Sequence, residues 1–313
     1  MYPKELFLGI DLYTICLCIA VIAAIVVYRI IADKLKIKAK LQNFCMFTAV
    51  GAVVVGYLSA VLFQGFYNIA TYGKFYIKGA TFYGGLIGGS AFFLLIYFVV
   101  GKFVFKDNYH IKSFFSIADI AACSITIAHS IGRIGCLMAG CCHGKATNAW
   151  YGINMTINGY TYKVIPTQLF EAIFLLFLFT YIVLRIKDKQ TYCLQTYMCV
   201  YGVWRYIIEF MRNDYRGTTV IESVTPSQLT AILMVLGGVA LIYIQYRLMN
   251  KRGTDTNVAA ATASASDADA DEASVNADDA DEDDDDDYIY AAEYEKKDTD
   301  EAKEESSEEN EDK

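Results

Sequence analysis

The chain has 313 residues, of which 55% are apolar in type, with only three prolines and nine cysteines. Its charge is unevenly divided: residues 253–313 hold 25 acidic and 4 basic side chains, whereas residues 1–252 hold 10 acidic and 23 basic ones. Several apolar stretches of about 20 residues in the first part have the length that a bilayer crossing needs. This composition excludes a water-soluble globular body.

The hydropathy pattern predicts an all-α polytopic membrane protein with seven transmembrane helices. We expect them at residues 12–32, 42–65, 82–100, 114–136, 167–186, 192–211 and 227–247. Residues 1–252 would form this membrane body. Residues 253–313 are rich in Ala, Asp, Glu and Ser and cannot bury enough apolar surface to fold alone, so we expect a disordered acidic tail.

The basic residues predict the orientation of the body. The connections on one side of the expected bundle hold 14 lysines and arginines, and those on the other side hold 7. Basic residues are enriched in cytoplasmic loops, so the N-terminus is expected outside and the tail in the cytoplasm.

Two tyrosines lie near the expected outer face, Tyr13 in the first helix and Tyr83 at the start of the third. Tyr13 alone is also typical of an interfacial anchor. The third helix carries two overlapping small-residue pairs, Gly84 with Gly88 and Gly85 with Gly89. Such GxxxG spacing favours close helix packing and needs no further function.

The stretch HSIGRIGCLMAGCCHGKAT, residues 129–147, places an arginine, Arg133, at membrane depth. An intramembrane arginine is costly in lipid and normally faces a cavity or a partner, and its planar guanidinium suits phosphate. His129 lies one turn earlier on the same face. Asp119 lies 14 residues before Arg133, too far to meet it along one helix, but it is suited to line a polar interior.

Residues 148–165 alternate polar and apolar side chains around Asn158-Gly159, which is typical of a small β-hairpin with a type I′ turn. Pro166 then opens the fifth helix, where proline is favoured at the first position. Glu171 enters the membrane soon afterwards and needs a partner.

The sixth helix contains YGVWRYIIEFMR, in which four polar residues share one face. They are Tyr201, Arg205, Glu209 and Arg212. One interpretation is an internal salt bridge of Glu209 with either arginine. However, one carboxylate between two arginines leaves positive charge over, and Arg133 adds to it. In the outer half of a bilayer, this surplus favours a lipid phosphate as ligand.

These motifs, in this order, resemble the bacterial prolipoprotein diacylglyceryl transferase family. The matching segments lie between about residues 8 and 247 and are GIDLYT, FYGGLIGG, HSIGRIGC…GCCHG, PTQLFEA and YGVWRYIIEFMR. The resemblance implies an enzyme of the bacterial cytoplasmic membrane with seven helices. It would move the diacylglyceryl group of phosphatidylglycerol onto the lipobox cysteine of a prolipoprotein signal peptide, releasing glycerol 1-phosphate. Its partners would be these substrates and the lipid bilayer, with no nucleic acid and no cofactor.

The resemblance also implies roles for residues. Arg133 and Arg205 match the two essential arginines of the family, and Tyr13 and Tyr83 join them as candidate catalytic residues. Its other polar and substrate-binding positions match the following residues: Arg212, Glu209, Tyr201, Gly84, Gly85, His129, Asp119 and Glu171. The chain departs from the family at Tyr83, where histidine is frequent, at Cys136, where asparagine is frequent, and at Cys141, where glutamate is frequent.

The mechanism needs an activated thiol, because the thiolate is the reactive form. Tyr83 and His129 are candidates to take the proton, with His143 a weaker one. We favour the field of Arg133 and Arg205, with Tyr83 orienting the thiol.

Two other classes of function remain open. Cys136, Cys141, Cys142 and His143 offer ligands for a metal or redox site, or a disulfide from Cys136 to either neighbour, although adjacent cysteines are not a standard zinc spacing. We assign no metal, because the acceptor brings its own thiol. A transporter is the third possibility, but the chain shows no internal repeat.

Overall fold

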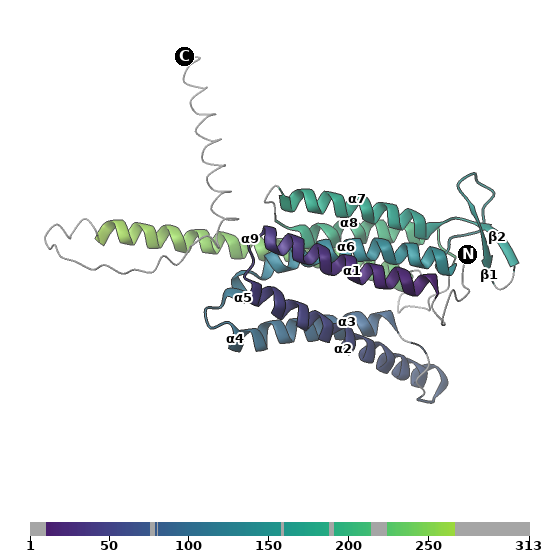
Figure 1. Ribbon diagram of the computed structural model, residues 1–313, viewed down its shortest axis with the longest axis horizontal. Coiled ribbons are helices and arrows are strands. Elements are labelled where there is room, and N and C mark those ends of the chain that lie inside the picture. Colours follow the sequence, from purple (N-terminus) through teal and green to yellow (C-terminus); the bar gives the residue numbers. More distant parts are fainter. Residues whose placement is uncertain are drawn as a thin grey trace, which may run out of the picture. The chain divides into compact units, whose positions relative to one another are not determined.

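The computed structural model describes residues 11–75, 79, 81–157, 160–187, 191–213 and 224–266 (Figure 1). The chain divides into two compact units, which are described separately: Met1–Tyr13 with Arg133–Lys313, and Thr14–Gly132. The elements in chain order are α1 (Leu12–Lys34), α2 (Ala39–Tyr72), α3 (Phe82–Leu95), η1 (Ile96–Val100), α4 (Gly101–Val104), α5 (Tyr109–Lys112), α6 (Phe114–Ala139), β1 (Ile153–Ile157), β2 (Tyr160–Val164), α7 (Thr167–Lys187), α8 (Cys193–Glu209) and α9 (Pro226–Ser266).

Six helical segments of the described residues are long and apolar enough to cross a membrane. They are Leu12–Lys34, Ala39–Ile69, Tyr83–Val104, Phe114–Ala139, Thr167–Lys187 and Pro226–Asn250. The segment predicted as the sixth span forms helix α8, which has only 17 residues and is not among these six. At 1.5 Å per residue it extends about 26 Å, slightly less than a hydrocarbon core of about 30 Å. A mostly helical, multi-span body is therefore confirmed with six candidate spans.

In the unit Thr14–Gly132, α2 and α3 pack through small residues. A Cβ atom at Gly89 would lie 3.0 Å from the backbone oxygen of Ala52, and one at Gly56 would lie 3.0 Å from that of Gly85. A methyl group at either position would press on backbone, which cannot rotate away. The predicted role of the glycine pairs in close helix packing is confirmed.

The other unit contains the predicted hairpin. Strands β1 and β2 are antiparallel, with Ile153 opposite Val164 and Ile157 opposite Tyr160. The register leaves two residues between the strands, Asn158 and Gly159, which lie outside the described residues. Met155 and Val164 pack against Leu137 of α6, so the hairpin is fixed to the end of that helix, as Figure 1 shows.

The last helix continues beyond its predicted end at residue 247. α9 extends to Ser266, through an alanine-rich segment that includes residues 259–261. Alanine has the highest helix propensity, which explains the continuation. The predicted boundary of the tail at residue 253 therefore falls within a helix, and residues 267–313 lie outside the described part of the chain.

Candidate active site

The carboxylate of Glu171 occupies the centre of a charged cluster in the unit that begins at Arg133. Glu171 lies in the second turn of α7 and is fully buried. Arg133 of α6 lies 3.0 Å from its Oε1, measured from Nη2, and the hydroxyl of Tyr201 donates to the same oxygen at 2.7 Å. The partner that Glu171 required is thus an arginine from one neighbouring helix and a tyrosine from another.

A second carboxylate, that of Glu209 at the end of α8, lies between two arginines. Arg205 Nη2 lies 2.7 Å from Glu209 Oε2, and Arg212 Nε lies 3.8 Å from the same oxygen. The spacings of four and three residues place these side chains on one face, as predicted. Both of the salt bridges that the spacing allowed, to Arg205 and to Arg212, are therefore present.

Arg212 connects the two carboxylates, because its Nη1 also lies 4.0 Å from Glu171 Oε2. The charges therefore alternate in one series, which we call the ion ladder: Arg133, Glu171, Arg212, Glu209 and Arg205. Three arginines and two glutamates leave one positive charge over. Burial of a cation without a counter-charge is costly, so this surplus among the described residues makes the ladder a candidate anion site.

Buried guanidinium nitrogens of the ladder, among them one of Arg133 and one of Arg205, have hydrogen-bonding capacity to spare. Arg133 Nε and Arg205 Nη1 are buried, and neither has a hydrogen-bond partner among the described residues. A buried donor without a partner costs about 1–3 kcal/mol. These two donors belong to the two arginines that sequence analysis singled out, and a phosphate oxygen is a suitable acceptor for each.

The start of α9 supports the ladder through residues that sequence analysis missed. Ser227 Oγ lies 2.7 Å from Arg205 Nη2, and Thr225 donates its hydroxyl to Glu209 Oε1 at 3.0 Å. Thr225 and Gln228 also form a reciprocal capping box, with bonds of 3.0 and 3.2 Å. The Thr-Pro-Ser-Gln sequence is a recognisable helix start, but its contact with the ladder depends on the fold.

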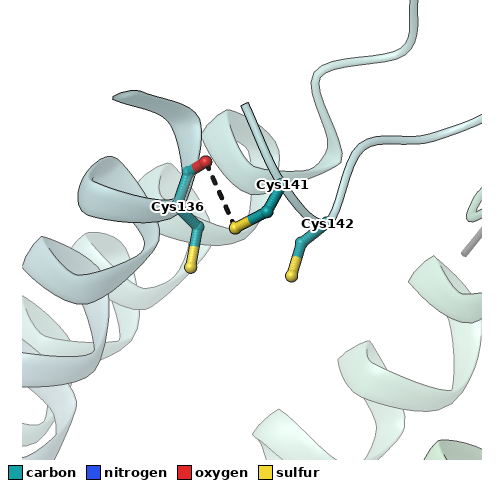
Figure 2. Close-up of side chains that lie close together, drawn as sticks. All are labelled: Cys136, Cys141 and Cys142. Atoms are coloured by element: carbon teal, nitrogen blue, oxygen red, sulfur yellow. Dashed lines mark hydrogen bonds between the residues drawn. The ribbon is translucent and has the colours of Figure 1, made fainter. Parts of the chain in front are cut away.

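The end of α6 brings three cysteines together. Gly140 adopts a left-handed conformation (φ +74°), its N–H bonds to Leu137, and the N–H of Cys141 bonds back to the carbonyl of Cys136. This is a Schellman motif, which reverses the chain onto the last helical turn. As a result, the sulfur atoms of Cys136, Cys141 and Cys142 all lie within 4.8 Å of one another (Figure 2).

The segment after the cysteines is fixed by α7 and by the end of α8. Thr167 donates to the carbonyl of Cys142 at 2.9 Å, and Gln168 donates to that of Cys141. Gly144 lies so close to Met211 and Ile165 that a Cβ atom there would meet the Met211 oxygen at 2.7 Å. The cysteine-bearing loop therefore has a defined conformation beside the ladder.

Electrostatic contacts connect the cysteines with the ladder. Hydrogen bonds with the thiols of Cys136 and Cys141, aided by the Arg212 guanidinium, hold the pKa of Cys142 below its usual value. Hydrogen bonds with the other two thiols raise the pKa of Cys141. Tyr13 interacts electrostatically with all three cysteines and with Arg133. The unit thus brings together seven predicted site residues: Tyr13, Arg133, Glu171, Tyr201, Arg205, Glu209 and Arg212.

The other predicted site residues belong to the unit Thr14–Gly132. Asp119 is buried on α6, and His129 lies on the same helix four residues before Arg133. Gly84 and Gly85 face α2, where added Cβ atoms would meet Phe63 and Ala60. Tyr83 is partly exposed at the start of α3. The geometry within this unit does not assign these five residues to a site.

The family profile described as prolipoprotein diacylglyceryl transferase matches residues 4–244, more than three quarters of the chain. The chain belongs to this family. The match covers α1 to α8 and most of the spanning part of α9, so the unit Thr14–Gly132 and the whole ion ladder lie within the family region.

Individual members of the prolipoprotein diacylglyceryl transferase family are distantly similar to the chain. It is 31% identical over 185 residues to phosphatidylglycerol–prolipoprotein diacylglyceryl transferase 2 of Clostridium perfringens, covering 56% of this chain and 66% of the relative. The enzyme of Clostridium tetani is 31% identical over 172 residues, covering 53% and 64%. That of Dehalococcoides mccartyi is 27% identical over 230 residues, covering 68% and 82%. The chain thus spans just under two thirds of the first two relatives.

Proposed function

We propose that this chain transfers the diacylglyceryl group of phosphatidylglycerol to the lipobox cysteine of a prolipoprotein. The products are a thioether-linked lipid and glycerol 1-phosphate. The observation that carries the proposal is the ion ladder, which among the described residues has one more arginine than glutamate and in which Arg133 Nε and Arg205 Nη1 are buried without a hydrogen-bond partner. Family membership and the names of the relatives supply the chemistry that such an anion site would serve.

The reaction is a displacement at the glycerol carbon that bears the phosphate. The thiolate sulfur forms a bond to this carbon, the carbon–oxygen bond to phosphate breaks, and its electron pair leaves with the phosphate. Negative charge therefore builds on the leaving phosphate in the transition state. Donors that are already fixed in a site of low dielectric constant stabilise such charge most effectively.

Arg133 and Arg205 are the residues that we assign to the phosphate. Each has one guanidinium nitrogen bound to a carboxylate and another without a hydrogen-bond partner. The carboxylate therefore orients the guanidinium group, and the second nitrogen can donate to a phosphate oxygen. Glu171 and Glu209 hold the arginines. Arg212 forms longer ion pairs with both glutamates, and Tyr201 donates a hydrogen bond to Glu171. These four are positioning residues in the proposal.

The remaining predicted residues have proposed roles at the substrates. Tyr13 would act on the acceptor thiol, and its proximity to Arg133 and the cysteines supports this role. Tyr83 would orient the same thiol, with His129 as the alternative proton acceptor. Gly84 and Gly85 would admit the lipid, and Asp119 would line the polar interior.

We also propose seven spans in a bacterial cytoplasmic membrane: the six candidate spans and, in addition, α8. Neighbouring helices that bury the polar face of α8 would compensate for its short length, since Arg205 and Glu209 are buried within the bundle. The distribution of basic residues supports an outer N-terminus and a cytoplasmic, acidic tail. Protease access to a C-terminal tag in intact cells would contradict this orientation.

Incubation of the purified full chain with phosphatidylglycerol and a lipobox peptide tests the activity. We expect mass spectrometry to show a diacylglyceryl adduct on the peptide cysteine and glycerol 1-phosphate in the medium. A peptide with serine in place of that cysteine is the control. Transfer to the serine peptide, or none to the cysteine peptide by folded protein, would contradict the proposal.

A further inference from the structure

The three cysteines at the end of α6 form a set of ligands that the phosphate site does not use. Their sulfur atoms lie within 4.8 Å of one another, and all three are free thiols (Figure 2). In a tetrahedral zinc site with bonds of about 2.3 Å, neighbouring sulfur atoms lie about 3.8 Å apart. The thiols therefore need to approach by only about 1 Å to share one ion.

The backbone supports this arrangement independently of the sulfur positions. The Schellman motif at Gly140 brings Cys141 back over Cys136, and Cys142 has a left-handed conformation (φ +63°) that is uncommon for residues with a side chain. Hydrogen bonds from α7 fix the carbonyl groups of Cys141 and Cys142. Two hydrogen-bonded side chains and one strained residue thus hold the three thiols on one side of the loop.

A metal ion accounts for the cluster better than a disulfide does. A disulfide joins two sulfur atoms at about 2.05 Å and leaves the third thiol without a role. Three thiolates with one Zn²⁺ carry a single negative charge, and Arg212 already interacts with Cys142. The nearby guanidinium groups would stabilise that charge.

The cluster has three protein ligands rather than four. His143 is not a member: its Nδ1 lies 3.0 Å from the Gly144 oxygen, and the ring nitrogens are not among the gathered ligand atoms. Cys141 is exposed, and Cys136 and Cys142 are partly exposed, so the site is open. Zinc sites with three protein ligands and an open fourth position are typical of catalysis, whereas structural sites are closed.

We propose that Cys136, Cys141 and Cys142 bind Zn²⁺ and that its fourth position takes the thiol of the acceptor cysteine. This rests on the proposed function, which requires a thiol nucleophile beside the phosphate site. A thiol bound to zinc is deprotonated, and its proton passes to water. The bound thiolate then attacks the glycerol carbon, the carbon–oxygen bond breaks, and the phosphate leaves with the electron pair. The neutral thioether is a weaker ligand and dissociates.

The three cysteines, to which the sequence analysis assigned no metal, would take part in transfer through the zinc ion. They are still not nucleophiles, because the sulfur that becomes alkylated belongs to the acceptor. Their role would be to hold the ion that activates the acceptor thiol. Arg133 lies one turn before Cys136 on α6. The thiolate and the leaving phosphate would therefore both bind near the C-terminal end of this helix.

Cobalt substitution tests the site without relying on activity. The reduced, metal-free full chain in detergent is titrated with Co²⁺, and thiolate-to-cobalt charge-transfer absorption is recorded. We expect one Co²⁺ per chain and displacement by Zn²⁺. Addition of the lipobox peptide, but not of its serine version, should raise the charge-transfer intensity by about one third, as three thiolates become four.

The matched variants are Cys141→Ser and Cys18→Ser, which replace exposed cysteines in the loop and in α1. Cys141→Ser should weaken Co²⁺ binding about 100-fold, because loss of a metal ligand should cost at least as much as loss of a residue that only hydrogen-bonds to a ligand. Cys18→Ser should bind Co²⁺ as the parent does. The Co²⁺ titration of the parent protein tests the site even without a folded Cys141→Ser variant. No charge-transfer band, an unchanged spectrum with peptide, or a disulfide among the three cysteines in the purified protein would overturn the proposal.

Failure of this inference can be distinguished from failure of the proposed function. Undiminished lipid transfer by metal-free protein would contradict the zinc site but leave the transferase assignment intact. A cobalt spectrum that responds to the thiol peptide, without lipid transfer in the zinc form, would support the site but contradict the transferase assignment.

Discussion

The ion ladder and the contact between α2 and α3 achieve close helix packing by opposite means. In the ladder, side chains from α6, α7 and α8 meet through charged groups, and the spare donors of Arg133 and Arg205 remain. Between α2 and α3, Gly56, Gly85 and Gly89 bring backbone against backbone with no charged group in the contact. The ion ladder leaves hydrogen-bond donors for a ligand, whereas the contact between α2 and α3 leaves no room for one between the two backbones.

The difference separates residues that serve chemistry from residues that serve packing. A buried arginine is retained at a cost, so its unused donors indicate a ligand. A glycine in a helix contact needs only close approach to justify its presence. Substitutions in the ladder should therefore change the transfer rate more than stability, and substitutions at Gly56 and Gly89 should do the reverse.

The largest effect is expected from Arg133→Lys and Arg205→Lys. Lysine keeps the charge but lacks the planar fork, so it cannot bind its glutamate and the phosphate together in the same geometry. We expect the transfer rate at saturating lipid to fall about 100-fold or more for each variant, as for other lost transition-state donors. Initial rates in detergent measure this.

Arg185→Lys is the matched control. Arg185 lies at the other end of α7 and donates to the Thr191 carbonyl at 2.9 Å, away from the ladder. Its replacement should leave the rate nearly unchanged. Near-normal rates for both Arg133→Lys and Arg205→Lys would show that the ladder is structural. The ladder and the contact between α2 and α3 would then both serve packing.

A smaller effect is expected from Glu209→Gln. Glu209 orients Arg205 and Arg212 but does not itself face the phosphate in the proposal. Glutamine can still accept a hydrogen bond from Arg205, so we expect the rate to fall about tenfold, within the range for partners that position a functional ligand. A loss equal to that of Arg205→Lys would mean that Glu209 takes part in the reaction directly.

Sequence spacing predicted the part of this site that lies within single helices. The intervals from Tyr201 to Arg212 placed one face of α8 correctly, and Arg133 was recognised by its depth. The contacts of Glu171, Thr225 and Ser227 cross between helices, so they depend on how segments far apart in sequence come together. Hydropathy predicted the six candidate spans, whereas α8 has only 17 residues and is not among them.

The cysteine cluster shows a second reason for incomplete prediction. The pattern Cys-x4-Cys-Cys matches no standard zinc spacing, and its geometry arises from the left-handed turn at Gly140. A glycine after a helical segment is a recognisable signal for such a turn. Combining that signal with the cysteine positions would have predicted the approach of Cys141 to Cys136, although not that of Cys142.

The smallest effect on transfer, but a clear effect on stability, is expected from Gly89→Ala. The new methyl group would lie 3.0 Å from the Ala52 oxygen, and because that atom belongs to the backbone of α2, the helices must separate slightly. Overpacking of this kind costs about 1–3 kcal/mol. Ser90→Ala is the control, since Ser90 is exposed on the next position of the same helix. Thermal unfolding in detergent should therefore distinguish Gly89→Ala from Ser90→Ala, while the transfer rate per folded molecule stays nearly equal for both. A large fall in rate for folded Gly89→Ala would place the contact between α2 and α3 within the substrate path. Both regions would then serve the reaction, and the distinction between a functional ion ladder and a packing contact would be wrong.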